Sequence, residues 1–388
     1  SSLHLKNSTS VKLRFKRRDS EYQTIPHWPI NRNWILYFIQ IIVVSQYSRE
    51  KQTKTSLQYN WNNETMKKIL LVTGGTGSFG SAVVKKFLKS KVYSEIRIFS
   101  RDESKQDSMA LNYNNSNLKF FLGDIRDRGR ITEACKGVDI VFHAAALKQV
   151  PSGENATWEH IKTNIIGSKN VIDAAISNKV KNLTLLSTDK SVYPINAMGM
   201  TKALMEKLAL SVDCPEKTNI NCVRYGNVLY TRGSVIPLFV NQILQKKDLT
   251  VTEPNMTRFL MKIDESIGLV EKSIMLKSGG SIFVKKSPAV KIISLAKVLI
   301  KIFHSKSKIK TVGVRPGEKN YETLINREEM VRTKSFPDHY VITNKIINKN
   351  SDKICPEYDS NNTKQLSDEA LEKLMLSLPE IKKVLNSY

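Results

Sequence analysis

A glycine-rich stretch has the residue types and the spacing needed to hold a phosphate-bearing cofactor. Residues 73–80 read Thr-Gly-Gly-Thr-Gly-Ser-Phe-Gly and stand between an apolar, strand-like run and a helical pattern. Glycines at these positions permit a tight turn, let the backbone approach a pyrophosphate, and let strand and helix pack closely. The helix that follows would offer unpaired backbone N–H groups to the phosphates. We therefore expect a dinucleotide-binding fingerprint, with a purely structural turn as the alternative.

The end of the next strand-like run bears on which dinucleotide would bind. Ser100, Arg101 and Asp102 close that run. In such folds an acidic residue accepts hydrogen bonds from the ribose hydroxyls of NAD, whereas an arginine suits the 2′-phosphate of NADP. Arg101, with Lys105 one helical turn further on, favours NADP. Asp102 keeps NAD as the less favoured alternative.

Two further short motifs follow the third and fourth strand-like runs. Gly-Asp-Ile ends at Ile125, and His-Ala-Ala-Ala ends at Ala146. Asp124 could accept a hydrogen bond from the adenine amino group, and the small alanines would let the backbone approach a cofactor. Each motif could equally be an ordinary loop that ends a strand, but their order after the glycine-rich stretch favours a shared site.

A polar cluster ends the fifth strand-like run, and a helical pattern follows it. The run closes with Ser187, Thr188, Asp189 and Lys190, and the helix carries Met-Gly-Met-Thr-Lys from Met198 onward. Residues 198 and 202 are one turn apart and share a helix face. The extended short-chain dehydrogenase/reductase superfamily places Ser/Thr and Tyr-x-x-x-Lys at these two points, and the chain resembles it.

The closer resemblance is to the UDP-N-acetylglucosamine 4,6-dehydratases. It is carried between residues 69 and 319 by TGGTGSFG, FSRDE, GDIRD, FHAAALKQVP, TNIIG, STDKSVYPIN, RYGNV, RGSVIPLF, TVTEPNMTRF and GVRPGEK. One departure matters, because Met198 stands where the superfamily has its catalytic tyrosine. The phrase PINAMGMTKALMEK resembles a branch in which methionine replaces the tyrosine: the bifunctional 4,6-dehydratase/5-epimerases that begin UDP-N-acetyl-L-fucosamine synthesis for capsule and O-antigen.

This resemblance implies a reaction and a role for each residue. Oxidation of the carbon-4 hydroxyl acidifies the carbon-5 proton; a base removes that proton, and hydroxide leaves carbon-6 with acid assistance. The resemblance assigns Asp189 as the acid and Lys190 as the base, and Lys190 would then need a depressed pKa. Lys202 would hold the nicotinamide ribose, and Thr188 would hydrogen-bond the carbon-4 oxygen. A core position for Met198 and a surface salt bridge between Asp189 and Lys190 are the plainer alternatives.

The same resemblance implies the binding residues. The cofactor contacts are expected at Gly74, Thr76, Gly77, Ser78, Phe79, Gly80, Ser100, Arg101, Lys105, Asp124, Ile125, Ala144, Ala145, Ala146, Lys148, Asn164, Ser187, Lys202, Tyr225, Asn227 and Val228. The substrate contacts are expected at Lys148, Asn227, Val235, Pro237, Thr250, Thr252, Arg258, Arg315 and Glu318. Arg258, Arg315 and Asn227 would meet a diphosphate, residues 235–237 and 250–252 would flank uracil, and Glu318 would accept from the ribose.

The elements that must position these residues are short strands alternating with helices. Strands are expected at 68–73, 95–100, 118–122, 139–143, 182–187 and 220–225, and helices at 81–89, 157–178 and 197–212. This alternation predicts an α/β fold with a Rossmann-type, doubly wound parallel sheet. We expect an extension over 1–65 that is dispensable, a cofactor domain over 66–230, a smaller substrate-binding lobe over 231–332, and a tail over 333–388 with a helix near 367–385.

Composition sets outer limits on function. The 388 residues are 40% apolar and 25% charged, in the globular range, and the net charge is +25. The lysines are spread along the chain without a basic stripe that contains aromatic residues, so an anionic small molecule is favoured over nucleic acid. The longest uncharged apolar run, 34–44, is too short to span a membrane. Four scattered cysteines predict neither a metal site nor disulfides.

Three functions remain open at this point. The leading one is the NADP-dependent dehydration of UDP-N-acetylglucosamine by a cytoplasmic homo-oligomer. A UDP-glucose 4-epimerase shares the fold and cofactor chemistry, but it would need the missing tyrosine and has no use for an Asp-Lys pair. A non-catalytic NADP-binding regulator is the third, and Met198 is its main support. An amphipathic membrane foot is the alternative interpretation of 1–65.

Overall fold

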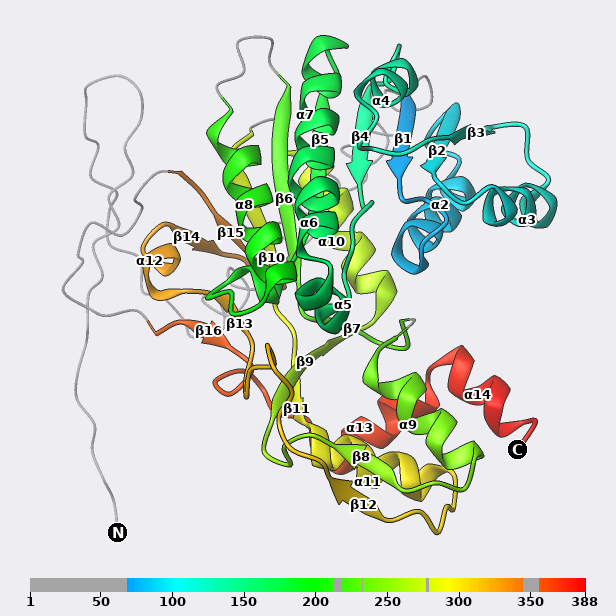
Figure 1. Cartoon of the computed structure of the whole chain (residues 1–388), viewed down its shortest axis with the longest axis vertical. Helices are drawn as coiled ribbons and strands as arrows, with labels where there is room; N and C mark the ends of the chain where they lie inside the picture. Colours follow the sequence, from blue (N-terminus) through cyan, green and yellow to red (C-terminus); the bar gives the residue numbers. More distant parts are fainter. Residues whose placement is uncertain (1–67, 213–217, 232, 277–278, 345–355) are drawn as a thin grey trace, which may run out of the picture. The chain divides into compact units, whose positions relative to one another are not determined.

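The computed structural model describes residues 68–212, 218–231, 233–276, 279–344 and 356–388. The predicted extension over 1–65 lies outside the described residues. Within them the main element is a nine-stranded sheet with the order β14-β15-β10-β6-β5-β4-β1-β2-β3 (Figure 1). Its strands are β1 (Ile69–Thr73), β2 (Glu95–Ser100), β3 (Leu118–Leu122), β4 (Ile140–His143), β5 (Asn182–Thr188), β6 (Asn219–Tyr225), β10 (Ser281–Lys285), β14 (Thr333–Ser335) and β15 (His339–Ile342).

The sheet is parallel from β3 through β10. At the far edge β15 pairs antiparallel with both β10 and β14, so β15 is the one described strand of this sheet that runs in the opposite direction. The central strands are almost wholly apolar and buried, as in β1, because helices cover both faces of a parallel sheet. All six predicted strands are present, with ends that differ by no more than one residue. The predicted doubly wound α/β fold is therefore confirmed.

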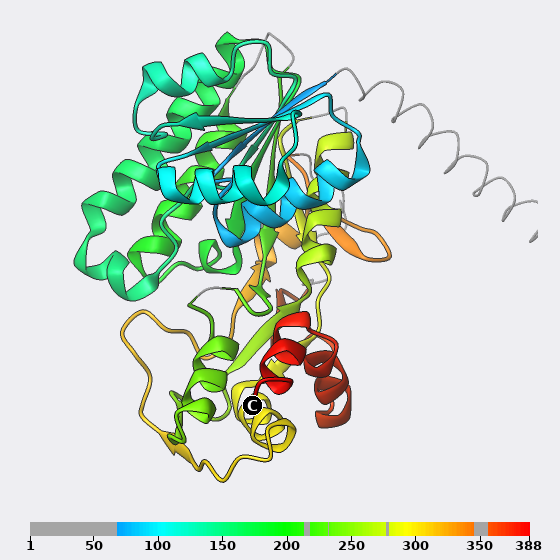
Figure 2. The ribbon, with the colours of Figure 1, turned by 90° about the vertical axis from the view of Figure 1, so that its right-hand side faces the viewer.

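Helices cover both faces of this sheet (Figure 2). They are α2 (Ser78–Ser90), α3 (Glu103–Tyr113), α4 (Arg128–Ala134), α5 (Val150–Asn155), α6 (Thr157–His160), α7 (Ser168–Ser177), α8 (Ala197–Ser211) and α10 (Ile263–Met275). The helix predicted over 157–178 is interrupted, because a π-helical segment, η1 (Ile161–Gly167), joins α6 to α7. A short 3₁₀ turn, η2 (Asp189–Ser191), follows β5.

A smaller group of elements has its own apolar core. It contains α9 (Val235–Leu244), α11 (Ile292–Ile302), α13 (Asp368–Leu376), α14 (Pro379–Leu385), β7 (Asn227–Val228), β8 (Leu249–Val251), β9 (Thr257–Met261), β11 (Ala289–Lys291) and β12 (Ile309–Thr311). β13 (Thr323–Ile325) pairs with β16 (Tyr358–Asp359), and α12 (Arg327–Met330) follows β13. The single terminal helix predicted over 367–385 is two helices, because Pro379 starts a new one.

Neither of the two groups of elements is one continuous stretch of the sequence. β10 pairs in parallel with β6 inside the large sheet, although it lies in the segment predicted as the substrate-binding lobe. Strands β14 and β15, from the predicted tail, extend the same sheet. Leu371 and Ile381, from the end of the chain, belong instead to the smaller core. The predicted boundaries at 230 and 332 therefore do not coincide with the edges of the sheet.

Candidate active site

A cavity of about 960 Å³ opens at the carboxyl ends of the parallel strands. Such ends, where the strand order reverses on either side of β1, are where ligands bind in doubly wound folds. The cavity continues along α9, β8 and β9 of the smaller group. It brings together these predicted residues: Gly74, Gly77, Ser78, Phe79, Gly80, Ala144, Ala146, Lys148, Ser187, Thr188, Asp189, Lys190, Met198, Lys202, Tyr225, Asn227, Val228, Val235, Pro237, Thr250, Thr252, Arg258, Arg315 and Glu318.

The glycine-rich loop forms one end of this cavity. Gly74 has a φ of +68°, and a Cβ there would lie 2.8 Å from the Ala145 backbone. A Cβ at Gly80 would overlap the carbonyl oxygen of Gly74. Only glycines therefore allow this turn and the close approach of the 144–146 loop. Since α2 begins at Ser78, its first N–H groups face the cavity end, as a phosphate site requires.

A second set of predicted cofactor residues lies at the ends of β2 and β3, outside the cavity lining. Arg101 is 54% exposed, and its Nη1 lies 3.5 Å from the carboxylate of Asp124. Arg126 donates to the same carboxylate through its backbone N and its guanidinium. Asp124 is therefore already engaged by arginine, and its bond to adenine stays a prediction.

Lys105 and Ser100 have partners of their own in this region. The ammonium of Lys105 pairs with Asp102, whose carboxylate also caps α3. Ser100 accepts from the buried amide of Gln106 through both its hydroxyl and its carbonyl oxygen. Of these predicted contacts, Arg101 has the most exposed side chain. Thr76 also lies outside the cavity lining, in the glycine-rich loop.

Three predicted cofactor residues, Asn164, Ile125 and Tyr225, have contacts within the protein that support the fold, and their contacts with a cofactor stay predictions. Asn164 is fully buried in η1: its Oδ1 accepts from Leu147 N at 2.9 Å, and its Nδ2 donates to Leu147 O and Thr201 Oγ1. Ile125 packs against Gly167. The Tyr225 hydroxyl donates to Ser266 O at 2.6 Å, while the ring contacts Phe79. Asn164 therefore shapes the 144–149 loop from behind, and sequence spacing alone could not tell support from contact.

The predicted Asp-Lys pair lies in the wall of the cavity. Asp189 is 1% exposed, and its Oδ1 accepts from Thr188 Oγ1 at 2.9 Å and from Lys190 Nζ at 3.0 Å. Among the described residues, nothing hydrogen-bonds to its Oδ2. Burial is the largest influence on Asp189 and raises its pKa above the ordinary value, despite the attraction of Lys190. The alternative of a surface salt bridge is excluded by this burial.

Lys190 does not have the depressed pKa that a resting base requires. Burial lowers its pKa, but attraction to Asp189 and to Glu322 outweighs burial and places the pKa above its ordinary value. Lys190 Nζ lies 3.1 Å from Glu322, a carboxylate from just before β13. Sequence reasoning did not include this second carboxylate, and the role of Lys190 as a base stays a prediction.

Met198 and Lys202 both face the cavity from one side of α8. Lys202 is 5% exposed, and its Nζ donates to the Leu186 carbonyl at 2.7 Å. Burial lowers the pKa of Lys202 to about 8. Met198 is buried in the cavity wall, and its thioether has no proton to give. Met198 is therefore buried like a core residue and also lines the cavity.

The other end of the cavity is polar and lined by the smaller group. Arg258 is buried, and its guanidinium donates to the carbonyl oxygens of Thr257 and Lys319 at 2.8 Å. Glu318 accepts from the backbone N of Arg315, so these two residues form one loop at the cavity edge. Within the described residues, Asn227 Oδ1 and Ser234 Oγ are buried at this cavity without a hydrogen-bond partner.

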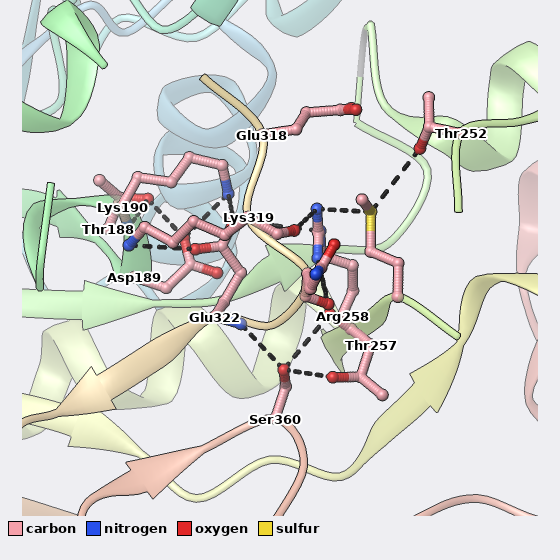
Figure 3. A network of polar contacts seen from close by, with 12 residues as sticks. Thr188, Asp189, Lys190, Thr252, Thr257, Arg258, Glu318, Lys319, Glu322 and Ser360 are labelled. Carbon is pink, nitrogen blue, oxygen red and sulfur yellow. Dashed lines mark hydrogen bonds and ion pairs between the residues drawn. The ribbon is translucent and has the colours of Figure 1, made fainter. Parts of the chain in front are cut away.

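Sequence reasoning missed Glu322, Lys319 and Ser360. Figure 3 shows the Glu322 side chain beside those of Lys190 and Lys319, and Ser360 hydrogen-bonded to the Glu322 backbone. The signal for Lys319 and Glu322 was their place at and just after the GVRPGEK motif. Nothing in the sequence pointed to Ser360, which lies in the predicted tail. The part of the chain that the structure describes contains no group of acidic, histidine or cysteine side chains suited to a metal ion, and no helix that could cross a membrane.

Comparison with known proteins agrees with this arrangement. The family described as polysaccharide biosynthesis protein matches residues 70–344. The chain belongs to this polysaccharide biosynthesis protein family. Among its relatives, proteins named UDP-glucose 4-epimerase from Rickettsia bellii (strain RML369-C) and Rickettsia akari (strain Hartford) are each 50% identical over 336 residues, which cover 82% of this chain and 98% of theirs.

Solved structures place this family member in the extended short-chain dehydrogenase/reductase fold. Pen from Bacillus thuringiensis is 34% identical, with a TM-score of 0.76 over 80% of this chain and 98% of that one. DesIV, a dTDP-glucose 4,6-dehydratase from Streptomyces venezuelae, is 22% identical, with a TM-score of 0.59 over 65% and 86%. A UDP-N-acetylglucosamine 4-epimerase from Methanobrevibacter ruminantium M1 is 20% identical, with a TM-score of 0.61 over 83% and 99%. The last two show the fold alone.

Proposed function

We propose that this protein catalyses the NADP-dependent 4,6-dehydration of UDP-N-acetylglucosamine, with inversion at carbon-5. The product would be the first intermediate towards UDP-N-acetyl-L-fucosamine for a surface polysaccharide. The observation that carries the proposal is the buried Asp189–Lys190 pair in the cavity wall, at 3.0 Å. An enzyme that only inverts carbon-4 needs no acid and base for carbons 5 and 6.

The cavity fits a nicotinamide dinucleotide. The close backbone approach at Gly74 and Gly80, and the start of α2 at Ser78, suit a pyrophosphate. Arg101 would hold the 2′-phosphate that distinguishes NADP, and DesIV was solved with NAD bound. When bound, the nicotinamide would supply the hydride acceptor and donor that oxidation at carbon-4 and reduction at carbon-6 require.

Asp189 and Lys190 would reach their working forms by one proton transfer. At rest the ammonium of Lys190 donates to Asp189 Oδ1. Movement of that proton to Asp189 Oδ1 yields a carboxylic acid and a neutral amine together. The raised pKa of Asp189 favours this transfer, whereas the raised pKa of Lys190 opposes it. Lys190 Nζ would then take the carbon-5 proton, and Asp189 would protonate the departing carbon-6 hydroxyl.

Proton removal at carbon-4 needs a group other than Met198. Thr188 Oγ1 lies in the cavity and donates to Asp189 at rest, so it could instead accept from the carbon-4 hydroxyl. Lys202, held by Leu186 O, would orient the nicotinamide ribose. At the polar end, Asn227 and Arg315 would meet the diphosphate, residues 235–237 and 250–252 would flank uracil, and Glu318 would accept from the ribose. Arg258 would act there through the 319–320 backbone that it holds.

UDP-glucose 4-epimerase is the second candidate, and the names of the 50% identical relatives favour it. Against it, Met198 occupies the position where the superfamily has its tyrosine. The two reactions differ at carbon-5, because only dehydration breaks the bond between carbon-5 and its hydrogen.

An incubation in heavy water separates the two candidates. The protein is mixed with NADP and UDP-N-acetylglucosamine, and NMR follows the sugar. A 4-keto-6-deoxy product with deuterium at carbon-5 is expected, and Lys190→Ala should lower its rate by about a hundredfold or more. Lys301→Ala, an exposed lysine on α11, is the control and should retain full activity. Conversion of UDP-glucose to UDP-galactose without deuterium at carbon-5 would instead establish the epimerase.

A further inference from the structure

Glu322 is a buried carboxylate that the reaction described above does not use. It is 2% exposed, lies just before β13, and its Oε1 forms an ion pair with the Lys190 ammonium at 3.1 Å. Lys190 therefore lies between two buried carboxylates, Asp189 and Glu322, at nearly equal distances. Such burial is costly for a carboxylate unless cations compensate it.

The charged groups that face Glu322 come from three elements. Lys190 and Asp189 belong to η2, Arg258 Nε of β9 lies 3.9 Å from Glu322 Oε1, and Lys319 Nζ of its own loop lies 3.7 Å from Oε2. Three cations thus surround two carboxylates. Burial opposes the ionisation of Glu322, but Lys190, Arg258 and Lys319 together hold its pKa below the ordinary value. Glu322 therefore stays ionised and supplies a negative charge to this cluster.

The backbone of Glu322 is fixed from the far end of the chain. Glu322 N donates to Ser360 Oγ at 3.0 Å, and Ser360 N donates to Glu322 O at 2.9 Å. Ser360 Oγ also lies 2.7 Å from Thr257 Oγ1 on β9 (Figure 3). In the described residues, Glu322 Oε2 has no hydrogen-bond partner although it is buried and Glu322 lines the cavity. Ser360 therefore fixes the backbone of Glu322, while Glu322 Oε2 accepts no hydrogen bond from any described residue. We interpret the carboxylate as one whose negative charge matters to its neighbours.

We propose that Glu322 is a positioning residue. Its carboxylate holds the Lys190 amine beside Asp189, and its negative charge lies next to both of these groups. This inference rests on the proposed dehydratase function, since it assigns Glu322 a task in the acid and base steps. After Lys190 has taken the carbon-5 proton, Glu322 would stabilise the ammonium that forms. Before that step, its charge discourages ionisation of Asp189.

The test uses the change of one negative charge. Glu322→Gln keeps the size and an acceptor oxygen but leaves the three cations around a single carboxylate. Loss of a negative charge at this range lowers the pKa of every neighbouring group by about one unit or more. Both limbs of the pH profile of kcat/KM should therefore move to lower pH, by about one unit or more. A residue with a merely structural task would change the amount of active protein without moving the limbs.

A second readout needs neither substrate nor cofactor. Lys190 is labelled with a small amine-reactive reagent across a pH series, and mass spectrometry measures modification of the peptide that contains it. Because only the neutral amine reacts, Glu322→Gln should shift the midpoint of labelling to lower pH, by about one unit or more. Glu322→Asp retains the charge but shortens the reach, so it should keep the midpoint and the limbs while kcat falls. Glu328→Gln, an exposed glutamate on α12, should match the unmutated protein in every measurement.

The outcomes separate this inference from the proposed function. Limbs and a labelling midpoint that stay in place in folded Glu322→Gln would overturn the role of Glu322 alone. An unmutated protein that forms no product would overturn the dehydratase, while the labelling series still decides the charge effect on Lys190. If Glu322→Gln does not fold, Glu322→Asp carries the test: unmoved limbs with a lower kcat support the inference, and shifted limbs overturn it.

Discussion

The guanidinium of Arg224 lies 2.6 Å from the carboxylate of Glu206, and both side chains are buried. A second carboxylate, Glu329 of α12, binds the same guanidinium at 2.9 Å. Ser191, the last residue of η2, donates to Glu206 at 3.0 Å. This ion cluster ties β6 to α8 and α12 and reaches the turn that carries Asp189 and Lys190.

Arg224→Ala should strongly destabilise the fold. It leaves two buried carboxylates without their cation, and breaking a buried pair in this way costs about 3–5 kcal/mol. Lys169→Ala is the control, because Lys169 forms an exposed pair with Asp173 on α7, and such pairs contribute about 1 kcal/mol or less. Urea unfolding measures both. If the two variants lose similar amounts of unfolding free energy, the Arg224 cluster does not contribute to stability as predicted.

Lys202→Met should stabilise the protein while removing its activity. The buried ammonium costs folding free energy, since its pKa of about 8 is below the ordinary 10.5. The gain at pH 7 should be about 1–3 kcal/mol, measured by urea unfolding. The proposed contact between Lys202 and the cofactor ribose would be lost in the same variant, so activity should fall by about a hundredfold or more.

The pH dependence of stability gives an independent check on Lys202. Between about pH 8 and 10.5 the folded protein releases this proton while the unfolded chain retains it, so this group makes stability rise with pH. Below pH 8 its full cost is present, and above 10.5 the cost is gone. The rise should be smaller in Lys202→Met than in the unmutated protein. Identical curves in that range would show that Lys202 is not depressed.

Arg101 should determine the preference for NADP over NAD. A charge-assisted contact to phosphate contributes about 1.5–3 kcal/mol, so Arg101→Ala should weaken NADP about tenfold to a hundredfold and leave NAD unchanged. Lys105→Ala is the matched comparison, because Lys105 is already paired with Asp102 and should matter less. Calorimetric titration of both cofactors measures these affinities. Equal affinities in the unmutated protein would end the assignment to NADP.

Met198 should contribute little to the barrier. Because its thioether cannot transfer a proton, Met198→Ala should change the rate by less than about tenfold, or about 1.4 kcal/mol. Lys202→Ala should cost far more. Met198→Tyr would accelerate the reaction only if the phenol reaches the carbon-4 oxygen. Steady-state kinetics with UDP-N-acetylglucosamine compare these proteins, and an inert unmutated protein beside an active Met198→Tyr would refute the proposed function.

The sequence by itself determined the strands and helices of the sheet and the end of the cavity that the glycine-rich loop forms. Alternating apolar strands and helices predict the parallel sheet, because each pattern is local and its period depends on neighbouring residues alone. The same holds for residues 73–80, whose turn requires glycine at Gly74 and Gly80. Since parallel strands place their carboxyl ends along one edge, residues after β1, β4 and β5 had to meet there.

Only the tertiary structure decided the protonation of the residues that line the cavity. It also decided which predicted residues line the cavity and which hold a neighbouring loop in place. Asn164 and Asp189 are both polar residues in motifs, yet one is enclosed by Leu147 and Thr201 and the other lies in the cavity wall. Lys190 is predicted as a base, but Asp189 and Glu322 together raise its pKa and keep it charged at rest. A pKa depends on burial and on every charge within a few ångströms, whatever its distance along the chain. For Lys190 one of the two carboxylates that raise its pKa, Glu322, is held in place by Ser360, in the last segment of the chain.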